Sequence, residues 1–175
     1  MLHLSFPNIS HKSRYLEMVE EWKAFEIPTS PWALFLGGSF ESFLDITTTY
    51  VTANPKWINS TLFFFMDDET ILGAIQIRHQ IDHPNTSPEG AWGGHIGYGL
   101  RPSARGKGLA REMLKLWLQE AHNLGIEKVL ISAYEDNIAS WKTIESCGGV
   151  FFKTLPKERR ILKLGLPQLR VSFSE

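Results

Sequence analysis

The sequence from Gly93 to Leu118 reads GGHIGYGLRPSARGKGLAREMLKLWL, and it predicts a strand, a loop and a helix in that order. Its first part, up to Arg101, alternates apolar residues with glycine, which is typical of a strand that kinks or lies close to a ligand. Pro102 ends this strand because proline has no N–H for a β-ladder. From Leu109 onward apolar residues recur with helical spacing, and Gly125 stands where a C-terminal cap is expected.

The loop between this strand and this helix has the composition of an anion site. It runs from Arg105 to Ala110, and its glycines leave backbone N–H groups uncovered at the positive end of the helix dipole. A Walker A loop does not fit, because Arg101 stands in place of its first glycine and Gly108 in place of Ser or Thr. A dinucleotide fingerprint does not fit either, since Arg111 or Pro102 would occupy its last glycine position.

One phosphate-loop pattern does fit, and it resembles a known family. The pattern Arg/Gln-x-x-Gly-x-Gly/Ala is satisfied by Arg105, Gly108 and Ala110, directly after a glycine-interrupted strand that ends in Leu-Arg-Pro. This loop resembles the pyrophosphate loop of the GNAT superfamily of N-acetyltransferases.

A second stretch also resembles that superfamily. It is similar to the segment Asn-x-x-Ser...Tyr-Glu-x-x-Gly-Phe and reads DNIAS at 136–140, IE at 144–145 and GGVF at 148–151. By motif the resemblance covers roughly residues 70–164, and the remainder matches by element order. The combination also looks like a group of bacterial proteins known chiefly as predicted acetyltransferases.

The amino-acid composition limits the classes of protein to which the chain could belong. The chain has 175 residues, of which 43% are hydrophobic, so we expect residues 1–175 to form a single domain with its own core. The formal net charge of −1 provides no general field for nucleic acid or an acidic membrane. One cysteine excludes an internal disulfide, no Cys/His cluster has zinc spacing, and no metal site is expected. Without a signal peptide or a long apolar run, we expect a cytoplasmic protein.

The rest of the chain predicts helices and strands around the central unit. The predicted ranges, with the central unit included, are 2–6, 10–25, 39–51, 62–66, 71–81, 95–101, 109–124, 128–134, 137–147, 150–154 and 160–165. Ser10 is expected to cap the first helix, whose inner face would hold Tyr15, Leu16, Val19, Trp22 and Phe25. The order predicts an α/β (α+β) fold with a mixed, mostly antiparallel central sheet and helices on both faces. This is the GNAT order.

The resemblance implies acetyl-CoA as co-substrate and indicates the residues that hold it. The loop residues for the pyrophosphate are Arg105, Gly106, Lys107, Gly108, Leu109 and Ala110. Main-chain groups near Gly99, Leu100 and Arg101 would pair with the pantetheine arm and the thioester carbonyl. Asn137 would contact the pantetheine or support the neighbouring strand, together with Ser140 of the second signature. The alternative for Asn137 is a plain helix N-cap.

Acetyl transfer also needs a base, because an amine with a pKa near 10.4 is mostly protonated at neutral pH. His95 stands where many relatives have Glu, and an imidazole can accept that proton. The alternative is a structural histidine, and His79 and Glu135 are further candidates. Ile144 occupies the usual place of the tyrosine that protonates the departing thiolate. Tyr134 is the predicted substitute catalytic residue, with Tyr98 as its alternative.

The sequence therefore predicts an acetyl-CoA-dependent N-acetyltransferase. Its acceptor would be a primary amine of a small molecule or an exposed amino group that attacks the thioester directly. The aromatic N-terminal half would supply the acceptor pocket, although core packing explains most of those side chains equally well. Two alternatives stay open: a catalytically weak or inactive CoA-binding module, motivated by Ile144, and an unrelated anion-binding or interaction domain. Neither nucleic acid nor membrane is expected as a partner, and a homodimer stays open.

Overall fold

The computed structural model describes residues 1–25, 31, 34, 38–51, 58–80, 94–155 and 159–165. The elements follow in the order β1 (Leu2–Ser5), η1 (Ile9–His11), α1 (Lys12–Ala24), α2 (Phe40–Val51), β2 (Ser60–Asp67), β3 (Thr70–Arg78), β4 (Ile96–Leu100), η3 (Pro102–Ala104), α4 (Leu109–Asn123), β5 (Lys128–Tyr134), α5 (Ile138–Ser146), β6 (Val150–Leu155) and β7 (Arg159–Gly165). The predicted order and fold class are confirmed. The predicted connection 82–92, and most of the apolar segment before α2, lie outside the described residues.

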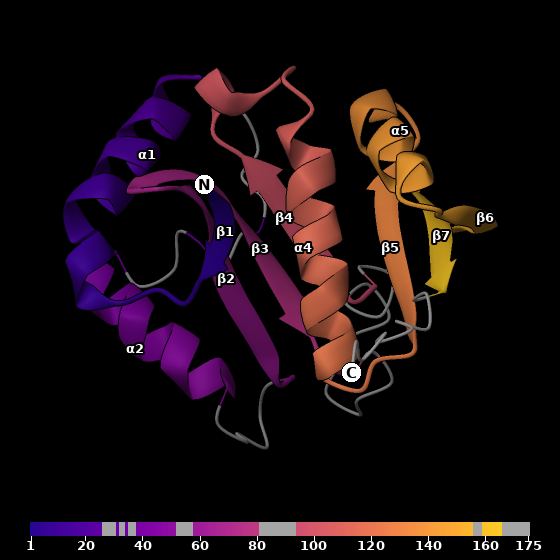
Figure 1. Ribbon diagram of the computed structural model, residues 1–175, viewed down its shortest axis with the longest axis horizontal. Coiled ribbons are helices and arrows are strands. Elements are labelled where there is room, and N and C mark those ends of the chain that lie inside the picture. Colours follow the sequence, from indigo (N-terminus) through magenta and orange to yellow (C-terminus); the bar gives the residue numbers. More distant parts are fainter. Residues whose placement is uncertain are drawn as a thin grey trace, which may run out of the picture.

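The predicted central sheet is divided into two sheets (Figure 1). Strands β1-β2-β3-β4 form one antiparallel sheet, and strands β5-β7-β6 form another. Gly94 and Ile131 make an isolated bridge between them, and the His95 N–H donates to Leu130 O at 2.8 Å. The Leu130 N–H then donates to Nδ1 of His95 at 3.1 Å. Because an imidazole takes the place of a backbone carbonyl there, the ladder does not continue at this point.

Helices cover both faces of the first sheet (Figure 1). One cluster packs α1 and α2 against β2 and β3, and its largest fully buried side chains include Trp22, Phe40 and Phe64. The other cluster packs α4 against the opposite face and α5 against α4 and β5, with Trp117 and Ile144 fully buried. Full burial of side chains of this size contributes roughly 1.5–3 kcal/mol each. The two clusters hold α1 and α4 in place on either side of β4.

The N-terminal cap differs from the prediction. Asn8, not Ser10, provides it: its side chain accepts the Ser10 N–H at 3.0 Å, while His11 Nδ1 accepts the Asn8 N–H at 3.2 Å. This reciprocal pair of hydrogen bonds caps the N-terminus of η1, the single turn that precedes α1. The expected Ser10 cap is therefore wrong.

The inner face of α1 is also narrower than predicted. Its buried residues are Tyr15, Met18, Val19 and Trp22. These positions follow the i, i+3, i+4, i+7 rule for one helix face. Leu16 and Phe25 lie beside that stripe and are 46% and 57% exposed, so their predicted burial is wrong. Within the described ranges, no helix combines the length and apolarity needed to cross a membrane.

Candidate functional site

An open cleft of about 680 Å³ lies beside the central strand-loop-helix unit. Its walls are the end of β4, the loop leading into the first turn of α4, and the first half of α5. The lining residues are Trp22, Tyr98, Gly99, Leu100, Arg105, Gly106, Gly108, Leu109, Ala110, Arg111, Asn137, Ala139, Ser140, Lys142 and Thr143. Most of the predicted cofactor-binding residues are thus brought together in one cleft.

The loop backbone is shaped for an anion. Gly106 and Gly108 both have φ of +74°, a conformation that costs other L-residues roughly 1–2 kcal/mol. A Cβ atom added at either position would meet open space, so no atom of the described residues covers this side of the loop. Gly108 is the N-cap of α4, and helix N-termini attract phosphate through their dipole and their unpaired N–H groups.

Among the described residues, the charged side chains that line the cleft are all basic: Arg105, Arg111 and Lys142. Arg105 donates from Nε to Leu100 O at 2.9 Å, and its guanidinium lies 5.5 Å from the Trp22 ring centroid. Lys107 is exposed and does not line the cleft. Although the whole chain carries a formal charge of −1, the cleft therefore presents a positive local field.

The α5 side of the cleft holds the two residues of the second signature. Asn137 caps α5, because its Oδ1 accepts the Ser140 N–H at 3.1 Å, so the N-cap role is confirmed. The Ser140 hydroxyl oxygen lies 2.8 Å from that of Tyr98 and so links α5 to β4. Burial raises the pKa of Tyr98, outweighing the opposite effect of the bond with Ser140. The Tyr98 hydroxyl is therefore protonated at neutral pH.

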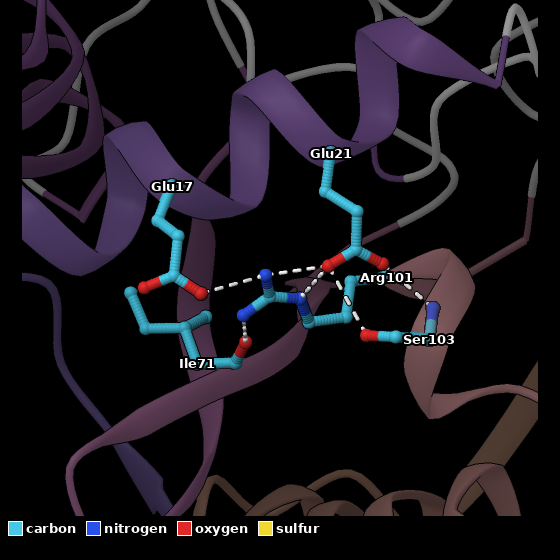
Figure 2. Close-up of polar contacts among 5 residues, drawn as sticks. All are labelled: Glu17, Glu21, Ile71, Arg101 and Ser103. Carbon is cyan, nitrogen blue, oxygen red and sulfur yellow. Dashed lines mark hydrogen bonds and ion pairs between the residues drawn. The ribbon is translucent and has the colours of Figure 1, made fainter.

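Arg101 is not among the residues that line the cleft, and Figure 2 shows the contacts of its side chain. Its buried guanidinium forms ion pairs with Glu17 and Glu21 of α1 and donates to Ile71 O at 3.3 Å. Its backbone N–H donates to Leu72 O at 2.8 Å. Among the predicted cofactor residues, Arg101 and Lys107 are the ones that the cleft lining does not include. Arg101 instead joins the end of β4 to α1.

We expect Glu21 to make the folding stability sensitive to acid, because its pKa is lowered in the folded state. Burial of its carboxyl group raises the pKa, but hydrogen bonds from Ser103 and Arg101 outweigh burial, and the net pKa lies below the ordinary 4.5. Such a group stabilises the folded state above its unfolded pKa, and the contribution is lost as pH falls through the folded-state value. We expect the unfolding free energy to fall as pH drops below about 4.5, and Glu21→Gln to remove part of that decline. Urea unfolding at neutral and acid pH measures both; identical declines would contradict this expectation.

The two predicted catalytic residues are not brought into the cleft. His95 is 9% exposed and lies where the two sheets meet, with Nδ1 accepting the Leu130 N–H. Tyr134 ends β5, its side chain is 50% exposed, and its carbonyl accepts from Nε1 of Trp141 at 3.1 Å. Neither residue belongs to the cleft lining.

Ile144 and His79, which were considered above, and the single cysteine, Cys147, all pack against or bond to other protein groups. Ile144 is fully buried in the core cluster of α4 and α5. Cys147 packs against the same cluster, its Sγ lies 3.8 Å from Arg111 O, and burial raises its pKa. His79 Nε2 lies 2.9 Å from Thr61 Oγ1, and burial lowers its pKa. In the part of the chain that the structure describes, no group of three or more His, Cys, Asp and Glu side chains could hold a metal ion.

The comparisons with known proteins agree with this geometry. The family model described as Acetyltransferase (GNAT) domain matches residues 7–150. No curated protein sequence is a significant match. Solved structures share the fold over nearly their whole length. The yncA protein of Salmonella typhimurium, solved with its cofactor acetyl-CoA, has 14% identity and a TM-score of 0.67, covering 95% of each chain.

Two further structures come from enzymes with named acceptors. The spermidine N-acetyltransferase of Vibrio cholerae has 13% identity and a TM-score of 0.64, covering 99% of this chain and 98% of its own. The Salmonella typhimurium acetyltransferase that modifies the N-terminal serine of ribosomal protein L7/L12 has 15% identity and a TM-score of 0.65, covering 94% of each chain. At these identities the likeness shows the fold alone.

Proposed function

Because this chain belongs to the GNAT acetyltransferase family, which uses acetyl-CoA, we propose that it acetylates a primary amine of a small molecule or an exposed amino group. The observation that carries the proposal is the cleft beside the loop Arg105–Ala110. It combines a helix N-terminus, two glycines of positive φ and basic side chains alone among its charged lining residues. That combination suits the polyphosphate of a nucleotide-derived cofactor.

In this proposal different cleft residues bind different parts of acetyl-CoA. The cofactor supplies an acyl group that is bonded to a readily departing thiol. The loop N–H groups, with Arg105, Arg111 and Lys142, bind the phosphates. The backbone of Gly99 and Leu100 at the end of β4 pairs with the pantetheine arm. A thiol with a pKa near 8.5 leaves as thiolate with little help. Tyr98, a protonated hydroxyl in the cleft lining, is better placed than Tyr134 to donate a proton there.

The hydrogen bonds of His95 weigh against it as the base for the attacking amine. A backbone N–H can only donate, so Nδ1 of His95 accepts from Leu130 and Nε2 carries the proton of the neutral ring. Protonating Nδ1 would break the Leu130 contact. We therefore favour a structural role for His95, holding the two sheets together.

His95→Asn separates these two roles. The Asn side-chain oxygen can accept the Leu130 N–H, but it does not titrate near neutral pH. We expect His95→Asn to keep kcat and its pH profile within about threefold of the wild type, since loss of a general base costs roughly 100-fold or more. Steady-state rates across the neutral pH range measure this. A vanished ionisation with a large fall in kcat would restore His95 as the base.

The first experiment is a calorimetric titration of the purified protein with acetyl-CoA, with AMP and ATP as controls. Micromolar binding selective for acetyl-CoA supports the proposal, and no binding removes it. An amine screen read out by free thiol then tests polyamines against peptide N-termini, the acceptor types named for two structural relatives. Binding without thiol release from any amine would favour the alternative of an inactive CoA-binding module.

A further inference from the structure

The segment that leads into the phosphate loop is fixed to α1 at three alternate residues. Arg101 forms ion pairs with Glu17 and Glu21, Ser103 hydrogen-bonds to Glu21, and the Arg105 guanidinium lies over Trp22. All three partners belong to α1, about 80 residues earlier in the chain. The helix α1 therefore contacts this segment at Arg101, Ser103 and Arg105.

Glu21 contacts both Arg101 and Ser103, as Figure 2 shows. Oε1 accepts the Ser103 backbone N–H at 2.6 Å, while Oε2 accepts the Ser103 hydroxyl at 3.1 Å and the Arg101 guanidinium. Both oxygens are thus used, and the side chain is only 19% exposed. Glu17 is 65% exposed, and within the described residues its carboxylate pairs with Arg101 and not with Ser103. The two carboxylates therefore differ in which part of the segment they hold.

The loop needs such an anchor on its N-terminal side. η3, which precedes it, is a single turn of three residues, and so short a 3₁₀ turn has little stability of its own. Gly106 and Gly108 add the backbone freedom of glycine. On the C-terminal side the helix α4 fixes the chain, whereas on the N-terminal side the Glu21 carboxylate fixes η3 through Ser103.

We propose that Glu21 is a positioning residue for the cofactor: by holding Ser103 and Arg101 it keeps the loop in the geometry that binds the pyrophosphate of acetyl-CoA. The inference rests on the proposed function, because it assigns a new participant to the same site. Glu21 itself does not line the cleft. It acts through η3, so α1 becomes a determinant of cofactor affinity.

Glu21→Gln tests this role with almost no change of volume. Both carboxylate oxygens of Glu21 accept hydrogen bonds, whereas the NH₂ group of glutamine can only donate. In either orientation of the amide, this NH₂ would face a donor: the Ser103 N–H, or the Ser103 hydroxyl and the Arg101 guanidinium. We expect the Kd and the KM for acetyl-CoA to rise about tenfold, the loss typical of a charge-assisted hydrogen bond. The kcat and the KM for the amine should stay within about twofold.

Two variants on the same helix serve as controls. Glu17→Gln removes the charge of a carboxylate that is 65% exposed in its pair with Arg101, and it should leave the Kd within about twofold. Val19→Ala creates a packing defect on the buried face of α1 and lowers the Tm without touching Ser103. If Glu21→Gln binds acetyl-CoA like the wild type, or if Val19→Ala weakens binding equally, the positioning role is overturned.

Ser103→Ala provides a second route should Glu21→Gln fail to fold. Ser103 is exposed, and alanine removes only the hydroxyl bond to Glu21, so we expect about a threefold rise in Kd. An unchanged Kd in that variant would overturn the inference. A wild-type protein that does not bind acetyl-CoA would overturn the proposed function, and this role with it, so the two failures are distinguishable.

Discussion

Gly108→Asp should abolish measurable acetyl-CoA binding, weakening it by about a hundredfold or more. Gly108 is the N-cap of α4 and lines the cleft at the point where we propose that phosphate binds. Two like charges 4 Å apart repel by about 1 kcal/mol in water and about 4 kcal/mol at a partly buried site, and a pyrophosphate carries more than one charge. Titration calorimetry with acetyl-CoA measures the effect.

Two controls separate charge from backbone strain. Gly108→Asn has nearly the same size and the same φ of +74°, but no charge, so it should retain part of the affinity that Asp removes. Gly125→Asp introduces the same side chain at φ +75° beyond the other end of α4, where a Cβ atom also meets open space. It should lower stability and leave the Kd unchanged. Normal binding by Gly108→Asp would exclude the loop as the phosphate site.

The central unit could be predicted because its signals are local. Pro102 ends the strand, the glycines allow the loop, and the apolar positions from Leu109 define the helix within a few residues of one another. The same reasoning located Gly125 as a C-terminal cap, and its φ of +75° confirms that assignment. The strand β5 likewise has the predicted bounds, Lys128–Tyr134.

Other features depend on partners distant in the sequence, and no local pattern reveals them. The guanidinium of Arg101 is bound by Glu17 and Glu21 about 80 residues away, and no local pattern indicated that this side chain would join β4 to α1. The basic side chains of Arg111 and Lys142 contribute to the cleft because α4 and α5 pack side by side. Helical periodicity identifies a buried face, but it does not say which polar residues meet across a cleft.

Gly94 and His95 join the two sheets, and this junction influences how far the loop lies from α5. The loop and α5 belong to different parts of the chain, and their separation depends on how β4 leaves β5. Gly94 and His95 make that junction through Leu130 and Ile131. A change at the junction should therefore alter both stability and the cleft.

Gly94→Ala should be the most destabilising single substitution at this junction, by about 3 kcal/mol or more. Gly94 has φ of +66°, and an added Cβ would lie 2.3 Å from Leu130 O, the acceptor of the His95 N–H. The estimate combines roughly 1 kcal/mol for the left-handed backbone with 1–3 kcal/mol for overpacking and a similar amount for the lost buried hydrogen bond.

Gly125→Ala is the matched control, because its φ of +75° carries the same backbone cost while its Cβ meets nothing within 4 Å. Urea unfolding of both variants should therefore give about 1 kcal/mol for Gly125→Ala and a clearly larger loss for Gly94→Ala. Acetyl-CoA affinity measured on folded Gly94→Ala should fall as well, since the altered junction changes the spacing between β4 and α5. Equal losses of stability in the two variants would mean that the close contact with Leu130 relaxes freely and does not hold the sheets in register.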